Sequence, residues 1–407
     1  MNLATVSLAY LRARALNTTL NVLLLALGIA TITLLLLATS QFEERMQRDA
    51  RGIDLVVGAK GSPMQIILSS IYQLDVPTGN VSWKQAQELG RHRAVKKMIP
   101  LALADNYRGF RIVGTNHDYA EHYGVRLAQG RLWQAPLEAV LGAEIAARTG
   151  LAMGATFIGA HGMGAGEREG DVMHETHSYR VVGVLAPTGT VVDRVVLTDV
   201  ASVWAVHADQ YDIKDVARIA ELLPDDEKEL TALLIQYSSP LAAAILPRYI
   251  NQNSEMQAAS PAYETARLFS IIGVGIDVLR GFALVLILAA GLSVFIALYN
   301  ALLERRYDLA VMRTLGASPA RLMTLMLFEG AMLAGIGAAL GLALGHVLTE
   351  LLGVAFKAAK QVAVTGWAWV PEELWLIGLA LAVGIFAALL PAWRAYRTDI
   401  AGTLARG

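Results

Sequence analysis

Three long apolar stretches in the last third of the chain limit what it can fold into. They run from Gly281 to Leu303, from Leu322 to Gly353 and from Leu374 to Pro391. Roughly 20 apolar helical residues cross a bilayer, so each stretch can span a membrane. With 17% charged residues and a mean hydropathy of +0.45, the 407-residue chain is apolar for a soluble protein but too polar to lie wholly in a membrane. We expect several membrane spans joined to a sizeable water-exposed part.

A fourth apolar stretch lies near the N-terminus. The 23 residues from Thr18 to Ser40 carry no charge, after a short amphipathic lead that contains Arg12 and Arg14. This apolar core is longer than the 7–15 residues typical of a signal peptide, and no convincing small-residue cleavage site follows it. We therefore interpret it as an uncleaved first transmembrane helix.

Basic residues predict the orientation of these four spans, because cytoplasmic loops carry an excess of Lys and Arg. They cluster before the first span, between the second and third, and after the fourth: Arg12, Arg14, Arg305, Arg306, Arg313, Arg321, Arg394, Arg397 and Arg406. Both termini are therefore expected in the cytoplasm, and the long segment after the first span is expected outside the membrane.

The predicted order of segments follows directly. It is a cytoplasmic lead (1–17), a first span (18–40), a periplasmic α+β domain with stalk helices (41–268), a second span (269–303), a cytoplasmic coupling hairpin (304–321), a third span (322–353), a periplasmic loop (354–373), a fourth span (374–393) and a cytoplasmic tail (394–407). The fold class is thus an α-helical membrane protein with an extracytoplasmic α+β domain. Helical continuations of the first two spans would form the stalk.

The hairpin between the second and third spans is short, charged and amphipathic. Leu309, Met312 and Leu315 recur at helical spacing, with arginines beside them. Gly316 stands where a helix ends, and Ser318-Pro319 stands where the next begins. A cationic helical hairpin between two spans is well placed to contact a cytoplasmic partner.

The same hairpin resembles a family signature. Glu304-Arg305-Arg306 followed by Met312 to Ser318 is similar to the pattern E-R-R-x-E-I-G-x-x-R-A-L-G-A-S of FtsX-like ABC permeases, which include MacB and LolC/LolE. Asp308 replaces the usual Glu, and Leu309-Ala310 replaces Ile-Gly. The resemblance implies that an ATPase couples to this hairpin, through Glu304, Arg305, Arg306, Asp308, Arg313 and Gly316.

The external segment alternates candidate strands and helices, which is typical of an α+β domain. The order of Val113-Gly114-Thr115, then Val140-Leu141-Gly142, then Tyr179 to Leu185 resembles the MacB-type periplasmic core domain. No G-x-x-x-x-G-K-[ST] motif occurs in the sequence, so ATP hydrolysis is expected on a separate polypeptide and the chain itself is not expected to be an enzyme.

One loop of the external segment has a composition that suits a metal. His161, His174 and His177 lie within 17 residues, among glycines and with Asp171 and three glutamates close by. Imidazole and carboxylate ligands suit Zn²⁺. The alternative is a solvated loop with no ligand. His174-Glu175-Thr176-His177 is one residue short of the H-E-x-x-H spacing of zinc peptidases, which disfavours a membrane metallopeptidase.

The third span carries both a glycine ridge and an acidic residue. Gly337, Gly341 and Gly345 form a G-x-x-x-G-x-x-x-G ridge, which predicts close helix packing within the bundle or across a dimer. Glu329 and His346 lie inside the same span, where ionisable residues are costly; an interhelical hydrogen bond is one explanation and a functional role is the other.

These features favour a machine that transmits motion over one that conducts substrate, because polar residues are sparse in the spans. The resemblance implies a homodimeric permease in the bacterial inner membrane with separate ATPase subunits. Its substrates would be lipoproteins, peptides or toxins, and a periplasmic adaptor or lipoprotein and membrane lipid would be further partners. The alternative is a non-transporting regulator of a periplasmic enzyme or of a zinc-linked process. The net charge of −1 gives no indication of a nucleic acid partner.

Overall fold

The computed structural model describes residues 3–103, 105–161, 173–207, 215–358 and 364–397. Asp171 and Arg406 lie outside these residues. The sequence pattern predicts a helix over 212–222, and its first residues lie outside them as well. The chain divides into two compact units, which are described separately. The first holds residues 1–42, 272–358 and 362–407, and the second holds 43–271 with 359–361.

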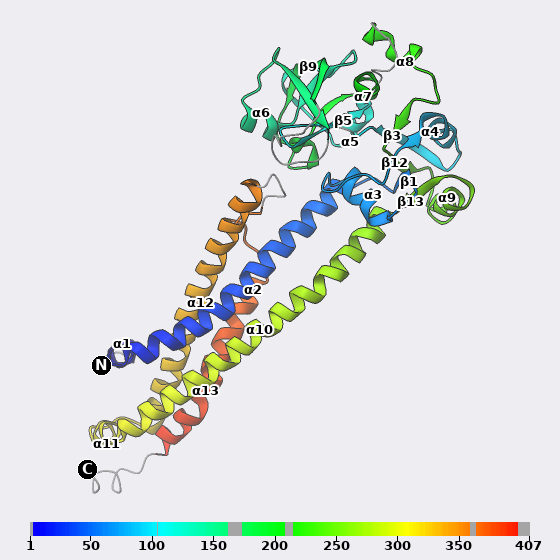
Figure 1. Ribbon diagram of the computed structural model, residues 1–407. Coiled ribbons are helices and arrows are strands. Elements are labelled where there is room, and N and C mark those ends of the chain that lie inside the picture. The colour runs from blue at the N-terminus through cyan, green and yellow to red at the C-terminus, as the bar shows by residue number, and fades with distance from the viewer. Residues whose placement is uncertain (1–2, 104, 162–172, 208–214, 359–363, 398–407) are drawn as a thin grey trace. The chain divides into compact units, whose positions relative to one another are not determined.

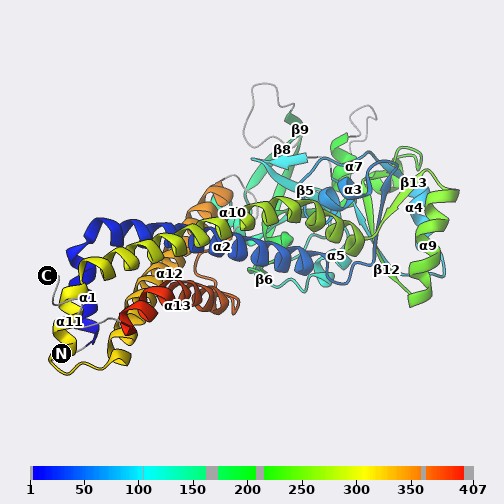
Figure 2. The ribbon, with the colours of Figure 1, turned by 90° about the horizontal axis from the view of Figure 1, so that it is seen from below.

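The first unit is helical. Its elements are α1 (Leu3–Ala13), α2 (Ala15–Ala50), α10 (Pro261–Glu304), α11 (Arg306–Thr314), α12 (Pro319–Ala358) and α13 (Glu373–Tyr396). The four helices α2, α10, α12 and α13 are long and apolar enough to cross a membrane. They run alongside one another, and α11 lies at the same end of this unit as α1 (Figures 1 and 2).

Small residues allow these helices to approach closely. Gly28 on α2 lies against α10, where a Cβ would come within 2.7 Å of Ile287. Gly330 on α12 faces Gly384 on α13, and a Cβ on either would lie 2.5 Å from the other's carbonyl oxygen. Such contacts give the van der Waals packing that holds membrane helices together in lipid.

The second unit is α+β. Its strands are β1 (Leu55–Ala59), β2 (Val81–Ser82), β3 (Val95–Leu101), β4 (Asp105–Tyr107), β5 (Phe110–Thr115), β6 (Leu127–Gly130), β7 (Glu138–Leu141), β8 (Thr156–His161), β9 (Met173–Leu185), β10 (Val196–Asp199), β11 (Glu229–Leu230), β12 (Ala232–Tyr237) and β13 (Met256–Ala259). Its other elements are α3 (Pro63–Ser70), α4 (Trp83–Gly90), α5 (His117–His122), α6 (Ala143–Thr149), η1 (Val191–Arg194), α7 (Val200–His207), η2 (Val216–Arg218), α8 (Ile219–Leu222) and α9 (Pro240–Asn253). The expected α+β class is confirmed.

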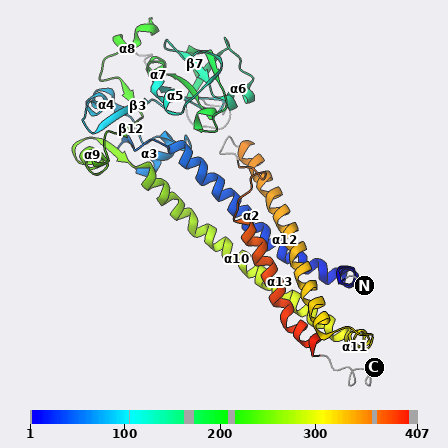
Figure 3. The ribbon, with the colours of Figure 1, turned by 180° about the vertical axis from the view of Figure 1, so that it is seen from behind.

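A four-stranded antiparallel sheet, in the order β13-β1-β12-β3, connects to the long helices. Strand β1 follows α2, β13 precedes α10, and the two strands pair with Val56 opposite Ala259. Leu55 and Val57 on β1 pack in a core shared with α4 and α9, whereas a Cβ on Gly58 would lie 3.4 Å from Ile66 of α3. The ribbon in Figure 3 shows α3, α4 and α9 near strands β3 and β12 of this sheet. Two chain segments far apart in sequence therefore meet in neighbouring strands.

A second, mixed sheet has the order β6-β9-β7-β10-β5-β4-β8. Strand β8 also pairs with β9, so the sheet closes on itself. Its buried core contains Ile112, Leu141, Tyr179, Val181 and Val196. Alternate residues of β5, β7 and β9 supply this core, as the period-2 pattern of strands requires.

Residues 60–61 form a bend before α3, and Ser62 then caps this helix by accepting the backbone N–H of Gln65, with Pro63 at the first helical position. Two local expectations differ from the structure. The helix predicted over 212–222 is, in its described part, the short elements η2 and α8. Leu315 was expected on the apolar side of the hairpin, but it ends α11 and is 82% exposed.

Candidate functional site

Helix α11 has the boundaries that the sequence predicts. Gly316 adopts φ +95°, its N–H donates to the Arg313 carbonyl oxygen and the N–H of Ala317 donates to Met312. These two bonds form a Schellman motif, which a glycine at this position favours. The Ser318 hydroxyl then accepts the Arg321 N–H, with Pro319 opening α12. A short charged helix is thus held between two long apolar helices.

The neighbouring residues Arg305 and Arg306 point to different environments. Arg306 is exposed, whereas Arg305 is 9% exposed and donates to the Glu329 carboxylate at 3.2 Å. The Arg305 guanidinium also lies 3.6 Å from the centre of the Tyr10 ring of α1. We call Arg305, Glu329 and Tyr10 the inner joint.

A second ion pair and a small cavity border the inner joint. Arg14 of α1's flank pairs with Glu304 at the end of α10. A cavity of about 30 Å³ is lined by Tyr10, Arg305 and Glu329 together with residues of α2, α10 and α12. It is of the size that one or a few water molecules require, and its lining is partly polar. Asn21, which lines this cavity, accepts a hydrogen bond of 2.5 Å from the Ser293 hydroxyl.

The glycine ridge of α12 packs inside this chain. A Cβ on Gly337 would come within 2.8 Å of Leu25, one on Gly341 within 2.7 Å of Ile29, and one on Gly345 within 2.6 Å of Thr33. All three partners belong to α2. Of the two alternatives left by the sequence, packing within the bundle therefore accounts for the ridge.

The opposite ends of α2, α12 and α13 are tied together by hydrogen bonds to a short loop. Gln41 exchanges two bonds with the backbone of Thr365, and the Glu350 carboxylate accepts the N–H of Gly366 and the hydroxyl of Thr365. His346 contacts the Gly366 carbonyl at 2.5 Å and Glu373 at 3.1 Å. We call Gln41, His346, Glu350, Glu373 and the loop 364–366 the outer clasp.

The outer clasp is closely packed and bears exposed tryptophans. A Cβ on Gly366 would lie 2.0 Å from the His346 carbonyl oxygen, and one on Gly353 would lie 1.9 Å from that of Val364. Trp367, Trp369 and Trp375 beside it are 86%, 60% and 80% exposed. Tryptophan is enriched where a membrane protein meets the headgroup region, so this end of the unit has the composition of a membrane interface.

In the second unit, the end of α2 is anchored to the closed sheet. The Asp49 carboxylate accepts the N–H of Val191 in η1 at 2.8 Å, and the Tyr123 hydroxyl donates to the Asp49 carbonyl oxygen at 2.9 Å. Arg48 reaches the Gly189 carbonyl oxygen. The same helix runs covalently into β1 of the four-stranded sheet, so α2 is attached to both sheets.

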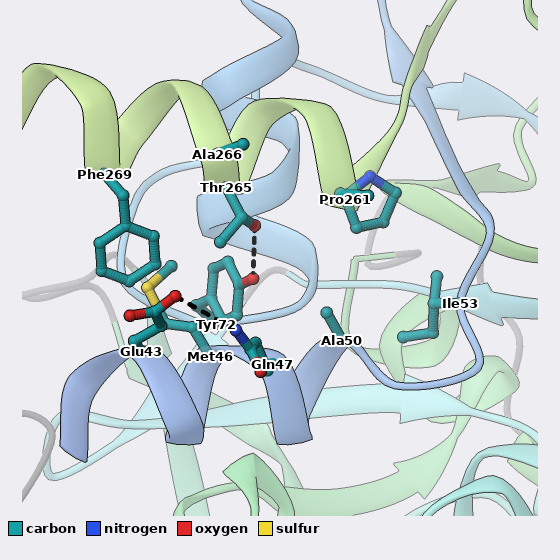
Figure 4. Close-up of a pocket in the computed structure, with 11 residues that line it drawn as sticks. Glu43, Met46, Gln47, Ala50, Ile53, Tyr72, Pro261, Thr265, Ala266 and Phe269 are labelled. Atoms are coloured by element: carbon teal, nitrogen blue, oxygen red, sulfur yellow. Dashed lines mark hydrogen bonds between the residues drawn. The ribbon is translucent and has the colours of Figure 1, made fainter. Parts of the chain in front are cut away.

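A cavity of about 360 Å³ lies between the second-unit ends of α2 and α10. Figure 4 shows Met46 and Phe269 at one end of it and Ile53 at the other, with Tyr72 in the middle. The Tyr72 hydroxyl shares a 2.8 Å hydrogen bond with Thr265. Burial raises the pKa of Tyr72 to about 12, so the phenol stays neutral at physiological pH. The cavity is therefore mostly apolar, with the Tyr72 and Thr265 hydroxyls, the Gln47 amide and the Glu43 carboxylate in its lining.

Two family models match long stretches of the chain. The model of the MacB-like periplasmic core domain matches residues 18–244, more than half of the chain, and that of the FtsX-like permease C-terminal matches residues 280–400. The chain belongs to the FtsX-like, MacB-type permease family. It is an ABC transporter permease by family, which the resemblance of the hairpin and of the external segment had predicted.

Relatives of the permease match shorter stretches. The lipoprotein-releasing system transmembrane protein LolC of Xylella fastidiosa is 30% identical over 158 residues, which cover 35% of this chain and 38% of that protein. An uncharacterized ABC transporter permease of Methanocaldococcus jannaschii is 26% identical over 126 residues, covering 30% of this chain and 31% of that protein. The matched region is thus less than two fifths of either relative.

Two solved structures match about half of the permease. The periplasmic region of MacB from Actinobacillus actinomycetemcomitans is 12% identical with a TM-score of 0.35, covering 55% of this chain and 97% of that one. The extracellular domain of the noncanonic ABC-type transporter YknZ from Gram-positive bacteria is 12% identical with a TM-score of 0.30, covering 51% and 99%.

The residues predicted for coupling do not all lie on one surface. Arg306 and Asp308 are exposed on α11, Arg313 is half-buried and Gly316 ends the helix in the open. Glu304 pairs with Arg14, and Arg305 is turned inward to Glu329. Of the residues predicted for coupling, some are thus exposed on α11, whereas Glu304 and Arg305 form ion pairs within the helical unit.

The structure leaves the predicted metal ligands partly outside its description. The side chains of His161 and His174 are not described, nor is Asp171. The backbones of β8 and β9 pair with Ala160 opposite Met173, which brings the segments bearing His161 and His174 together. Within the described ranges, no group of three His, Asp or Glu side chains is placed to hold a metal ion.

Several residues of the permease were missed from sequence. Tyr10, Gln41, Glu350, Glu373 and Asp49 all make contacts that join separate helices or sheets. Gln41, Glu350 and Glu373 carried a usable signal, because each is a polar residue at or near the end of an apolar stretch, whereas Tyr10 and Asp49 lie eight and nine residues from the first predicted span.

Proposed function

We propose that this permease couples ATP hydrolysis by a separate cytoplasmic ATPase to movements of its external domain, in the export or extraction of a periplasmic or outer-leaflet substrate such as a lipoprotein, peptide or toxin. It would act as a homodimer in the inner membrane, with both termini in the cytoplasm. The observation that carries this proposal is α11, a short helix closed by a Schellman motif between two membrane-spanning helices.

The exposed surface of α11 suits a protein partner. Arg306 and Tyr307 are exposed beside each other, with Tyr307 at 53%, and Leu315 at the end of the helix is 82% exposed. Arginine and tyrosine are enriched in the energetically important parts of interfaces, and an exposed leucine gains from burial. A cytoplasmic ATPase is the partner that the permease family supports.

Helical continuity supports transmission to the external domain. Helix α2 has no break between Ala15 and Ala50, and α10 has none between Pro261 and Glu304. A continuous helix transmits a displacement along its axis far better than a flexible linker, because each turn is held by backbone hydrogen bonds. The attachment of Asp49 to η1 would pass motion of α2 to the closed sheet.

The cavity between α2 and α10 supports an amphiphilic substrate. Its lining by Met46, Ile53, Pro261 and Phe269 suits an apolar side chain or acyl chain, and Tyr72 with Thr265 offers hydroxyl groups. Ala266→Phe would fill this space. This variant should transport less substrate while it binds the ATPase as the wild type does. Equal transport by the variant and the wild type would mean that the substrate does not pass through the cavity.

A role for zinc is a further proposal on the external domain. The pairing of β8 with β9 brings together the segments that carry His161 and His174. Zinc ligands must be deprotonated, so affinity should fall as pH drops through the histidine range near about 6.5. Calorimetric titration with Zn²⁺ should separate the wild type from the His161/His174/His177→Ala variant. Identical titrations would mean that the segment from His161 to His177 is a solvated loop without a metal ligand role.

Co-expression with candidate ATPases tests the proposed function. The wild-type permease should co-purify with one ATPase, and ATP should drive movement of a substrate. Arg306→Glu should weaken that complex, and Gly316→Pro should leave hydrolysis uncoupled from transport, because proline fixes φ near −65° where φ +95° is needed. ATP hydrolysis without substrate movement would favour the regulatory alternative.

A further inference from the structure

The inner joint sits at the bend between α10 and α11. Arg305 has φ −101° and ψ 12°, its N–H donates to Ala301 in α10 and its carbonyl oxygen accepts the N–H of Leu309 in α11. The backbone of this one residue therefore belongs to both helices. Any change in the angle between α10 and α11 must alter the surroundings of its side chain.

That side chain contacts two further helices. The guanidinium reaches Glu329 of α12 and stacks on Tyr10 of α1. The Glu329 side chain is 2% exposed and the Arg305 side chain 11%. A buried charge that loses its partner is left uncompensated in a poorly solvated site, so the two residues are strongly constrained to move together.

The adjoining cavity leaves room for such movement. Its volume of about 30 Å³ lies between Arg305, Glu329 and the first turns of α2. Close-packed interiors resist displacement, whereas a small partly polar cavity lets long side chains shift without clashing. The ion pair can therefore stay intact while the bend opens or closes.

We propose that Arg305 is a positioning residue that links the α10–α11 bend to α12 and α1 through Glu329 and Tyr10, while its neighbour Arg306 meets the partner protein. The proposal rests on the proposed function, since the movement it transmits would begin at an ATPase bound to α11. It separates two adjacent arginines of one motif into an internal and an external role.

The first test needs no partner. The chain contains no cysteine, so cysteines placed at the exposed positions Tyr307 and Arg321 can carry spin labels alone. Arg305→Met should broaden the distribution of distances between the two labels, on α11 and α12. Glu329→Gln should broaden it too, and this substitution changes the volume of the side chain less. The exchanged variant Arg305→Glu/Glu329→Arg should narrow it again, and the matched control Arg306→Met should leave it unchanged. An Arg305→Met distribution identical to the wild type would overturn the inference.

The second test uses the complex with the ATPase. Arg305→Met should bind the ATPase within about twofold of the wild type, but move about tenfold less substrate per ATP hydrolysed. Arg306→Met should show the opposite result, with weakened binding. Arg305→Met that weakens binding as Arg306→Met does would contradict the assignment. If the wild-type permease bound no ATPase, the proposed function would be wrong. The spin-label distances would still decide whether Arg305 holds the bend between α10 and α11.

Discussion

The two ends of the helical unit are held together in different ways. The inner joint depends on one ion pair between long side chains and on a stacked ring, with a small cavity beside them. The outer clasp depends on several hydrogen bonds to backbone groups and on glycines pressed against carbonyl oxygens. Long side chains tolerate a shift of position, whereas backbone contacts at van der Waals distance do not.

The inner joint and the outer clasp also differ in the helices that supply their residues. The outer clasp takes residues from α2, α12 and α13, and none of its residues comes from α10. The inner joint includes the end of α10 through Arg305. We infer that α2, α12 and α13 move as one body at their outer ends, and that α10 is the helix whose outer end can change position relative to them.

The largest effect is expected from the ridge that holds α2 against α12 between the two ends. Gly341→Leu would place a Cβ 2.8 Å from the Ala26 carbonyl oxygen and the rest of the side chain into Ile29. Overpacking costs about 1–3 kcal/mol where neighbours can yield, and more where they are backbone atoms. Little folded protein should survive extraction in detergent, as judged by size-exclusion chromatography.

The matched control is Gly378→Leu on α13, where a Cβ would meet no atom within 4 Å. It should give a normal yield and elution profile. Equal losses from both variants would mean that any leucine at these glycines is harmful, and that the ridge has no special role.

A smaller, local effect is expected at the outer clasp alone. Gly366→Val would bring a Cβ to 2.0 Å from the His346 carbonyl oxygen and break the alignment of its N–H with Glu350. The loop with Trp367 should become accessible to protease and the tryptophan emission should change, while the inner joint keeps its geometry. If Gly366→Val also broadened the distance distribution between the labels on α11 and α12, the inner joint and the outer clasp would not be independent.

The smallest effect is expected from an ion pair in the second unit, which gives a reference for a partly exposed pair. Arg131 donates to both oxygens of Glu138 at 2.7 and 2.6 Å, and these bonds hold the pKa of Glu138 at about 2. A depressed pKa contributes stability above the unfolded value near 4.5, and this is lost as pH falls from about 4.5 towards 2. The melting temperature of Glu138→Gln should lie slightly below that of the wild type at pH 6, and the difference should vanish near pH 2. Arg131→Met should behave likewise, and a difference that persists at low pH would exclude the ion pair as its cause.

Sequence reasoning predicted the architecture because apolar length and glycine position are local signals. The continuous helices beyond Ser40 and before Gly281 and the end of α11 at Gly316 are all found. The segment from Tyr179 to Leu185 is found as part of strand β9.

The parts that sequence reasoning missed depend on distant partners. Arg305 and Arg306 are chemically identical neighbours, and their separation into buried and exposed positions is decided by Glu329, 24 positions away, and by Tyr10 on another helix. The anchor of Asp49 to Val191 joins residues 142 positions apart. Short strands such as β2 and β11 have too few residues for a period-2 pattern to be visible.

The central claim, that ATP binding on one side moves α10 at the other, is tested most directly by two pairs of spin labels on the complex with the ATPase. Val354 lies near the end of α12 and Leu374 at the start of α13, whereas Val278 lies within α10, shortly before its apolar stretch begins; all three are exposed. With ATP and vanadate, the account predicts that the Val278–Val354 mean distance shifts by about 2 Å or more, while the Val354–Leu374 distance stays constant. An unchanged Val278–Val354 distance in a complex that binds and hydrolyses ATP would contradict the account.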